Sequence, residues 1–479
     1  MSERMLKFVS VEKGMPDKRA PATRRDDFDE IFGEFAREKA AEQAGRCSQC
    51  GIPFCQVHCP LSNNIPDWLK LTAEGRLEEA YEVSAATNNF PEICGRICPQ
   101  DRLCEGNCVI EKGFESVSIG AVEKYITDTA FERGWIKPVK PRQELDQSVG
   151  IVGGGPGGLA AAEQLRRRGY QVHVYDRHDR IGGLLIYGIP NFKLEKHIVE
   201  RRSKLLAESG VVFHCNVEIG GAMSLAELRR RHDAVLLASG VYQARDIRAP
   251  GVGLKGIHAA LDYLIASNRV GLGDTVPAFQ DGTLDAHGKS VVVIGGGDTA
   301  MDCVRTAVRQ GAKSVRCLYR RDRANMPGSQ REVLHAEEEG VEFVWLSAPE
   351  AFLGDGRIRA VRAVRIHLGV ADASGRQTPT VIDGSSANIE ADMAIKALGF
   401  DPEDLPVLFG EPGLEVTQWG TLKINHRTMM TSLDGVFAAG DVVRGASLVV
   451  WAVRDGRDAA DRIRAYLQAK ASAPSMAAD

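Results

Sequence analysis

The stretch SVGIVGGGPGGLAAAEQLRRRGYQVHVYD, residues 148–176, decides the fold. Its apolar start, Val149–Val152, predicts a strand, the glycines predict a tight turn, and the rest predicts a helix followed by a second strand. Gly153, Gly155 and Gly158 stand in the spacing G-x-G-x-x-G directly after the first strand. At this spacing the first glycine permits the turn, the second lets the backbone approach a pyrophosphate, and the third lets helix and strand pack closely. The stretch therefore predicts a dinucleotide-binding unit of the α/β class.

The residues around this turn support the same interpretation. Asp176 ends the second predicted strand, eighteen residues after Gly158, where a carboxylate can accept hydrogen bonds from ribose hydroxyls. The helix is predicted to begin near Pro156, and its positive end favours a bound phosphate. A glycine turn with a purely structural role is the alternative.

A second unit of the same kind, KSVVVIGGGDTAMDCVRTAVRQGAKSVRCLYRR, spans residues 289–321. The internal repeat places Gly295, Gly297 and Ala300 at the three turn positions. Its second strand ends in Arg320 and Arg321 where the first unit has an acid. Guanidinium groups pair with a 2′-phosphate through bidentate hydrogen bonds, so the pattern favours NADPH over NADH. A solvated basic strand end is the alternative.

Two such units in one chain indicate hydride transfer between two nucleotides, FAD in the first unit and NADPH in the second. Here the sequence resembles the flavoprotein reductases that have two dinucleotide-binding domains. The resemblance implies that the late strand in DGVFAAGD (434–441) returns to the FAD domain and that its acid contacts the ribityl chain. The stretch VRGASLVVWAVRDGR (443–457) is predicted to begin a helix whose N-terminus faces the flavin ring. The predicted cofactor-binding residues are Gly153, Gly155, Pro156, Gly158, Asp176, Gly183, Leu184, Gly295, Gly297, Asp298, Thr299, Ala300, Arg320, Arg321, Gly440 and Asp441.

The first 145 residues have a different sequence pattern, with helical segments and eight of the eleven cysteines. Residues 29–46, 65–88 and 118–135 have the apolar spacing of helices, the second with a break at Gly75. The cysteines follow C-x2-C-x4-C-x3-C-P from Cys47 and C-x3-C-x5-C-x3-C from Cys94. Zinc sites usually pair short C-x2–4-C knuckles, whereas a dense run ending in Cys-Pro resembles the bacterial two-cluster ferredoxins. The spacing favours iron–sulfur clusters over zinc or structural thiols.

These segments predict an α/β protein with two Rossmann-like dinucleotide-binding domains after an all-helical iron–sulfur domain. The predicted limits are 1–145 for the iron–sulfur domain, 146–280 and 401–479 for the two parts of the FAD domain, and 281–400 for the NADPH domain inserted in it. The net charge of −4 argues against a nucleic-acid binder. The sequence has no apolar run of membrane-spanning length and no signal peptide at its start, so we expect no membrane contact and a cytoplasmic protein.

Several motifs together resemble the small (β) subunits of NADPH-dependent glutamate synthases and the N-terminal halves of dihydropyrimidine dehydrogenases. They are CSQCGIPFCQVHCP, NNIPDWLKL, CGRICPQDRLCEGNC, GGLLIYGIPNFKL, GGGDTAMDC and GVFAAGDVVRGASLVVWAVRDGR. The resemblance implies two 4Fe–4S clusters with interleaved ligands. It assigns one cluster to Cys47, Cys50, Cys55 and Cys108, and three ligands of the other to Cys59, Cys98 and Cys104.

The fourth ligand of the second cluster has two candidates. The dehydrogenase pattern has a non-cysteine ligand shortly after an Ile-Gly pair, and Glu123 stands at that place after Ile119-Gly120. A count of thiolates instead favours Cys94, which would give eight thiolates for eight irons. A carboxylate oxygen can bind iron, and its negative charge is expected to lower the cluster's reduction potential. We favour Glu123 as the fourth ligand. The alternative for Glu123 is a helix residue that is exposed to solvent and binds no iron.

The resemblance implies an electron-input subunit that oxidises NADPH through FAD and passes electrons through the clusters to a large (α) subunit. That partner would carry FMN, form a hetero-oligomer with this chain and make L-glutamate from L-glutamine and 2-oxoglutarate. We assign no catalytic acid or base, because hydride transfer depends on alignment. This chain alone is not expected to make glutamate, because Ser2 rather than a cysteine nucleophile follows Met1 and no stretch remains for an FMN-binding barrel. The alternatives are a stand-alone NADPH:ferredoxin-type oxidoreductase and a zinc-stabilised docking module on a simple flavoprotein.

Overall fold

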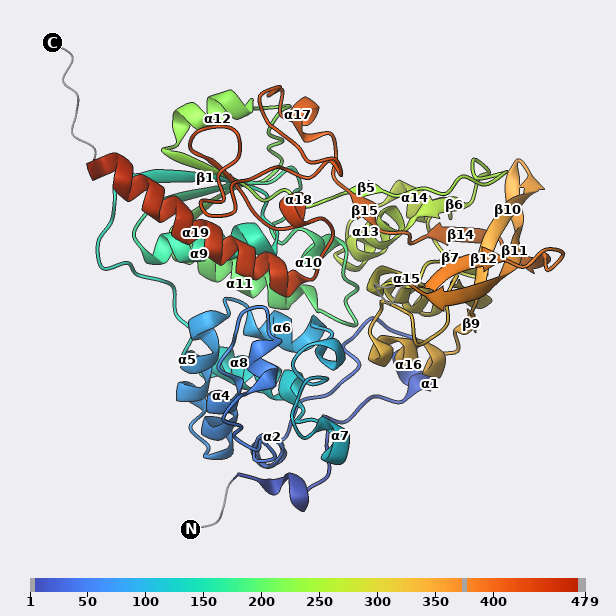
Figure 1. Cartoon of the computed structure of the whole chain (residues 1–479), viewed down its shortest axis with the longest axis horizontal. Coiled ribbons are helices and arrows are strands. Elements are labelled where there is room, and N and C mark those ends of the chain that lie inside the picture. The colour runs from blue at the N-terminus through green and yellow to red at the C-terminus, as the bar shows by residue number, and fades with distance from the viewer. Residues whose placement is uncertain (1–4, 373–376, 473–479) are drawn as a thin grey trace.

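The computed structural model describes residues 5–372 and 377–472 of the chain. The chain forms three parts: a helical part, blue to cyan in Figure 1, and two lobes that are each built around a parallel sheet. This arrangement is the predicted fold class. None of the helices in the described ranges combines the length and the hydrophobicity that a membrane span requires.

The helical part packs short helices around an apolar core in which Trp68 is fully buried. Its elements are η1 (Lys7–Val9), α1 (Pro21–Arg24), α2 (Arg37–Ala44), α3 (Phe54–Val57), α4 (Ile65–Ala73), α5 (Leu77–Thr87), α6 (Pro91–Ile97), η2 (Gln100–Arg102), α7 (Glu111–Phe114) and α8 (Ile119–Glu132). The two helices predicted within residues 65–88 are α4 and α5, and Gly75 lies between them with a φ of 79°. Because this φ is in the left-handed region, glycine is favoured at the break.

The helix predicted over residues 29–46 is wrong in its first half, because α2 begins only at Arg37. The backbone before α2 pairs with the preceding segment instead. Arg19 N donates to Ile31 O at 2.9 Å, and Gly33 N donates to Asp17 O at 2.9 Å. Ile31 and Phe35 are nevertheless buried. The apolar spacing of this segment therefore indicates which side chains are buried. The backbone forms hydrogen bonds with the preceding segment and does not form a helix there.

The first lobe contains a five-stranded parallel sheet of order β16-β4-β1-β2-β3. Its strands are β1 (Ser148–Val152), β2 (Gln171–Tyr175), β3 (Val211–His214), β4 (Ala234–Leu237) and β16 (Val436–Ala438). Its helices are α9 (Pro156–Arg167), α10 (Leu184–Tyr187), α11 (Lys196–Glu208), α12 (Leu225–Arg231), α17 (Leu405–Leu408), α18 (Asp441–Arg444) and α19 (Val449–Ser472). Because β16 pairs with β4, the C-terminal part of the chain completes the sheet that β1 begins.

The second lobe has a parallel sheet of order β6-β14-β7-β8-β9 and an antiparallel sheet of β10, β11, β12 and β13. Its strands are β6 (Ile257–Ala259), β7 (Ser290–Ile294), β8 (Ser314–Leu318), β9 (Glu342–Val344), β10 (Ser347–Asp355), β11 (Arg357–Ala371), β12 (Gln377–Val381), β13 (Ala387–Glu390) and β14 (Met393–Lys396). Its helices are α13 (Ala260–Gly271), α14 (Pro277–Gln280), α15 (Asp298–Arg309) and α16 (Gln330–Glu338). The expected limit at residue 281 leaves β6 outside this lobe, although β6 pairs with β14. We propose that the second domain begins before β6.

Two short strands join the lobes where the chain crosses between them. β5 (Gln243–Ala244) pairs antiparallel with β15 (Phe400–Asp401), and both lie between the lobes in Figure 1. The helical part packs on the first lobe through α6, because Phe90, Ile93 and Cys94 belong to the same apolar core as β1 and β2. The first lobe thus contacts both the helical part and the crossing strands.

Candidate cofactor sites

The glycine turn after β1 is shaped by close backbone contacts. Gly153 has a φ of 107°, and a β-carbon there would lie 2.3 Å from the carbonyl oxygen of Ala238. A β-carbon at Gly158 would lie 2.0 Å from the carbonyl oxygen of Gly153. At Gly155, by contrast, no atom of the described residues lies within 4 Å of that position. The first and third glycines are thus required by packing, and the second leaves open space in front of α9, as a bound pyrophosphate needs.

Asp176 lies at the end of β2 beside this turn and is buried. Its Oδ2 accepts a hydrogen bond from Gly154 N at 2.7 Å, and its Oδ1 accepts one from His178 N at 2.8 Å. Asp176 also lines a cavity with Gly153, Ser239 and Tyr242. Ser239 Oγ is buried there and has no hydrogen-bond partner among the described residues. A cavity with an unpaired hydroxyl beside a carboxylate fits the ribose end of a dinucleotide.

The other residues predicted to bind FAD lie around the same edge of the sheet. A β-carbon at Gly183 would lie 2.9 Å from Gly155 Cα, so the loop at Gly183 and Leu184 touches the glycine turn. Gly440 precedes α18 with a φ of 77°, and Ser447 Oγ donates to Asp441 Oδ1 at 2.6 Å. Burial raises the pKa of Asp441 to about 6. Pro156 is the first residue of α9, as predicted.

The second glycine turn repeats this geometry between β7 and α15. Gly295 has a φ of 148°, and a β-carbon there would lie 2.2 Å from Ala397 O. At Gly297 that position has no atom of the described residues within 4 Å. Ala300 is fully buried in α15, next to Thr299. Asp298 Oδ1 accepts a hydrogen bond from Ser329 N at 3.0 Å, so Asp298 holds the loop that precedes α16.

A cavity of about 770 Å³ opens at this turn. Gly295, Gly297, Arg320 and Arg321 line it, together with Arg245 from the crossing segment. Arg321 Nε is buried and has no hydrogen-bond partner among the described residues. A guanidinium group whose Nε has no partner fits a phosphate of the nucleotide in such a cavity. The sequence analysis missed Arg245, because only the pairing of β5 with β15 brings it here.

The cysteines of the helical part form two groups, and all of these cysteines are free thiols. Cys47, Cys50, Cys55 and Cys108 make up the first group. Burial raises the pKa of Cys55 to about 12, and the neighbouring thiols of Cys108, Cys47 and Cys50 act in the same direction. These four are the residues that the resemblance assigned to one cluster.

The second group contains Cys59, Cys98 and Cys104, with both candidates for the fourth position beside them. Burial raises the pKa of Cys59 to about 11, and Glu123 and Cys94 act in the same direction. A hydrogen bond with Cys94 and burial raise the pKa of Cys98. The structure thus brings all the predicted ligands together and leaves the choice between Glu123 and Cys94 open.

Glu123 is held by two asparagines that the sequence analysis missed. Asn88 Nδ2 donates to Glu123 Oε1 at 3.1 Å and Asn63 Nδ2 donates to the same oxygen at 3.4 Å. Burial raises the pKa of Glu123 to about 8. Both asparagines begin an Asn-Asn-x-Pro sequence just before a helix, NNIP and NNFP, which is the signal that could have identified them.

In the described ranges, no three Cys, His, Asp or Glu side chains lie in a group that could hold one metal ion. One group of four thiols, and another of three thiols with a carboxylate or a fourth thiol beside them, provide ligand sets that fit 4Fe–4S clusters.

Comparison with known proteins connects these sites. A family model described as dihydropyrimidine dehydrogenase domain II, 4Fe-4S cluster, matches residues 24–135, and one described as pyridine nucleotide-disulphide oxidoreductase matches residues 147–456. The chain is 71% identical over 474 residues to the glutamate synthase (NADPH) small chain of Azospirillum brasilense, covering 99% of this chain and 98% of that one. The chain belongs to the family of glutamate synthase (NADPH) small chains. The small chain of Escherichia coli is 44% identical and is covered completely, together with 98% of this chain.

Membership of the small-chain family confirms the resemblance stated from the motifs. The chain is an NADPH-dependent flavin and iron–sulfur oxidoreductase, with the iron–sulfur domain before the two nucleotide-binding lobes. The structure of FprA from Mycobacterium tuberculosis in complex with NADPH superposes with a TM-score of 0.57 at 21% identity, over 69% of this chain and 86% of FprA. That likeness supports the fold of the lobes. The cysteines of the described residues are free thiols, and Cys303 and Cys317 are buried in the core of the second lobe.

Proposed function

We propose that this small chain is the electron-input subunit of a glutamate synthase, with NADPH in the second lobe, FAD in the first and two 4Fe–4S clusters in the helical part. Bound FAD would take up a hydride from NADPH and release electrons singly, which joins a two-electron donor to one-electron carriers. The residues of this chain bind and align these groups, and a large subunit carrying FMN would use the electrons to make L-glutamate from L-glutamine and 2-oxoglutarate.

The observation that carries this proposal is the position of the second cysteine group against the first lobe. Cys59 and Cys98 pack against the apolar core that contains β1, α9 and α19. Arg454 on α19 donates from Nη1 to Pro60 O at 3.0 Å, directly after Cys59. α19 begins at Val449, within the stretch predicted to face the flavin. A cluster on the second group would therefore border the FAD domain.

Most of the first cysteine group belongs to or packs against the apolar core of the helical part, and the surface residues next to its cysteines in the sequence include exposed apolar side chains. Ile52, Phe54, Val57 and Val109 are 67%, 47%, 62% and 53% exposed, and each stands within two residues of a cysteine of this group. Exposed apolar side chains that gather in one place mark binding surfaces in soluble proteins. This surface supports the docking of the large subunit next to the first cluster, where electrons would leave the chain.

One experiment distinguishes the proposed function from its alternatives. The isolated chain, loaded with FAD, is expected to oxidise NADPH with ferricyanide, because both nucleotide sites lie within it. It is not expected to form glutamate from glutamine and 2-oxoglutarate until the large subunit is added. Glutamate formation by the pure chain would contradict the subunit role. NADPH oxidation that the large subunit never couples to glutamate, while a ferredoxin accepts the electrons, would support the stand-alone oxidoreductase. The match to a 4Fe–4S domain disfavours the zinc module.

A further inference from the structure

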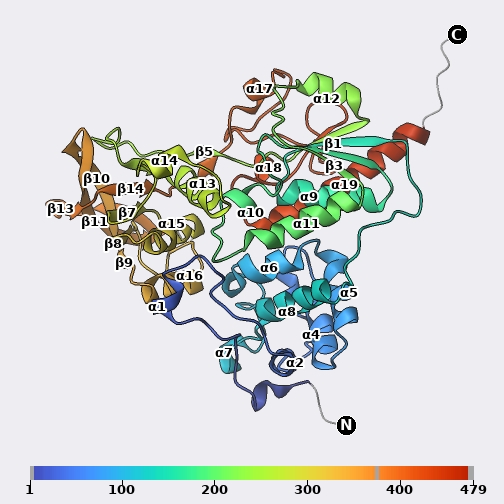
Figure 2. The ribbon, with the colours of Figure 1, turned by 180° about the vertical axis from the view of Figure 1, so that it is seen from behind.

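The segment of residues 16–32, which we term the strap, runs from the helical part to the second lobe. Its helix α1 lies against α16 of the second lobe in both views of the ribbon (Figures 1 and 2). At its other end Glu30 forms ion pairs with Arg96 and Lys124 of the helical part. The strap thus connects two parts of the molecule that are otherwise distant in sequence.

Arg24 is the residue of the strap that enters the second lobe. Its side chain is fully buried, and it donates from Nε to Glu339 Oε1 at 2.9 Å and from Nη2 to Glu338 Oε2 at 2.5 Å. Lys18 Nζ lies 2.8 Å from both carboxylate oxygens of Glu338. Phe32 packs edge-on against the ring of His335. A buried arginine is retained only with such partners, because an unpaired buried charge is strongly unfavourable.

The carboxylate of Glu339, which Arg24 contacts, also holds α15, the helix that follows the second glycine turn. Arg305 donates from Nη2 to Glu339 Oε1 at 2.8 Å, and Arg309 donates from Nη1 to Glu339 Oε2 at 2.7 Å. Burial alone would raise the pKa of Glu339, but the hydrogen bonds from Arg309 and Arg305 lower it to about 2. Arg24 therefore binds a carboxylate that is permanently charged near neutral pH.

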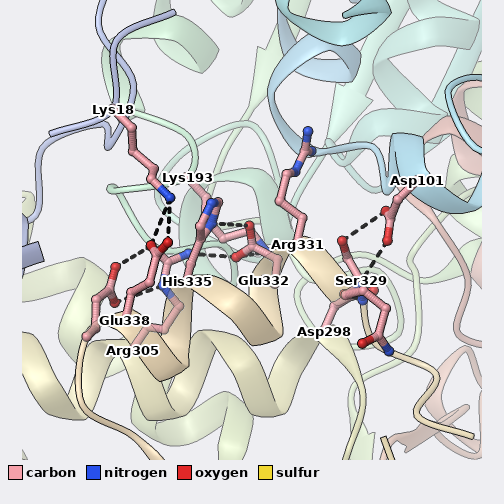
Figure 3. A network of polar contacts seen from close by, with 12 residues as sticks. Lys18, Asp101, Lys193, Asp298, Arg305, Ser329, Arg331, Glu332, His335 and Glu338 are labelled. Carbon is pink, nitrogen blue, oxygen red and sulfur yellow. Dashed lines mark hydrogen bonds and ion pairs between the residues drawn. The ribbon is translucent and has the colours of Figure 1, made fainter. Parts of the chain in front are cut away.

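The network continues into the first lobe and into the loop of the second cysteine group, as Figure 3 shows. Lys193 of the first lobe donates from Nζ to Asp302 on α15 at 2.8 Å. Asp101, between Cys98 and Cys104, accepts hydrogen bonds from Ser329 Oγ at 2.9 Å and from Gln330 N at 3.0 Å. Three separate elements thus hold α15 and α16 from outside the second lobe.

The crossing strands β5 and β15 contain two residues each. Short crossings of this kind act as hinges unless other contacts restrain them. Besides the crossing strands, α13 and the turn that follows it join the lobes through the ion pairs Arg269–Asp179 and Arg180–Asp274 and through a hydrogen bond from Asn268 Nδ2 to Tyr187 O. The contacts from the helical part add a restraint at the opposite side of the second lobe, on α15 and α16. We propose that the strap fixes the second lobe in the orientation needed for hydride transfer, and that Arg24 is the positioning residue of this restraint. The proposal rests on the proposed transfer of hydride from NADPH in the second lobe to FAD in the first.

The test compares Arg24→Met with Arg25→Met in the complex with the large subunit, because Arg25 is the exposed neighbour of Arg24. Flavin reduction by saturating NADPH is followed by stopped-flow absorbance. Arg24→Met is expected to slow it by at least about tenfold, because a small misalignment of reacting groups is costly in rate. The dissociation constant of NADP⁺, measured by calorimetry, should stay unchanged, because Arg24 does not line the nucleotide cavity. Arg24→Lys should restore part of the rate.

Unchanged flavin reduction in Arg24→Met with intact FAD content would overturn the proposal. If that variant does not fold, Glu338→Gln tests the proposal instead. Glu338 is 31% exposed, so its replacement is tolerated more easily, and it forms ion pairs with both Lys18 and Arg24 of the strap. Slower flavin reduction in Glu338→Gln supports the strap, and an unaltered rate overturns it. Failure of NADPH to reduce the flavin in the unmodified complex would instead contradict the proposed function.

Discussion

Replacing Arg320 and Arg321 together by glutamine is expected to raise the KM for NADPH by at least about tenfold while changing the KM for NADH far less. Both arginines line the cavity at the second glycine turn, and Arg321 Nε has no partner among the described residues. A charge-assisted hydrogen bond to the 2′-phosphate contributes about 1.5–3 kcal/mol, and every 1.4 kcal/mol corresponds to roughly a factor of ten. NADH has no such phosphate and should not lose these contacts.

Arg316→Gln provides the matched control, because Arg316 lies on β8 just before the two arginines but is paired with Glu342 at 2.7 Å and does not line the cavity. Initial-rate kinetics with ferricyanide as acceptor measure both nucleotides in each variant. Equal increases in KM for NADPH and NADH in the double variant would show that the two arginines do not read the 2′-phosphate.

Replacing Glu123 by alanine is expected to abolish the EPR signal of the second cluster, whereas Cys94→Ala should retain it. Glu123 lies beside Cys59, Cys98 and Cys104, and its carboxylate is oriented by Asn63 and Asn88. Cys94 packs in the apolar core of the first lobe, 4% exposed. Removing a ligand from a cluster should lower its occupancy as well as change its signal.

Iron content and EPR of variants purified without air, in complex with the large subunit, give the result. Cys303→Ala serves as the control, since Cys303 is a buried thiol of the second lobe, far in sequence from the cluster groups. Loss of the signal in Cys94→Ala but not in Glu123→Ala would reverse the assignment of the fourth ligand and leave the electron-transfer role intact.

The nucleotide sites could be anticipated from the sequence because their chemistry is local. A strand, a glycine turn and a helix within thirty residues carry the signal, and Gly158 is required by a contact with Gly153 O inside the same unit. Gly153 and Gly295 are required by the carbonyl oxygens of Ala238 and Ala397, which follow neighbouring strands of their sheets. The cysteine groups were accessible through their spacing and the family resemblance. Their members nevertheless come from distant segments, such as Cys47 and Cys108, which are 61 residues apart.

The features that escaped prediction depend on contacts between distant segments. Arg245 reaches the nucleotide cavity only because β5 pairs with β15. The strap, for which no structure was predicted before residue 29, pairs with itself and inserts Arg24 between two glutamates more than three hundred residues away. Neither pairing has a local signature, because an isolated arginine in a charged segment resembles any solvated residue.

The most direct test of electron input through FAD and the clusters uses Cys98→Ala in the complex with the large subunit. Cys98 is a proposed ligand of the second cluster and packs against the first lobe without lining either nucleotide cavity. Stopped-flow reduction of FAD by NADPH and the rate of glutamate formation are measured on the same preparation. We predict that NADPH reduces the flavin at the unaltered rate while glutamate formation falls to background. Glutamate formation at the rate of the unmodified complex, in protein that has lost the iron of the second cluster, would contradict this route.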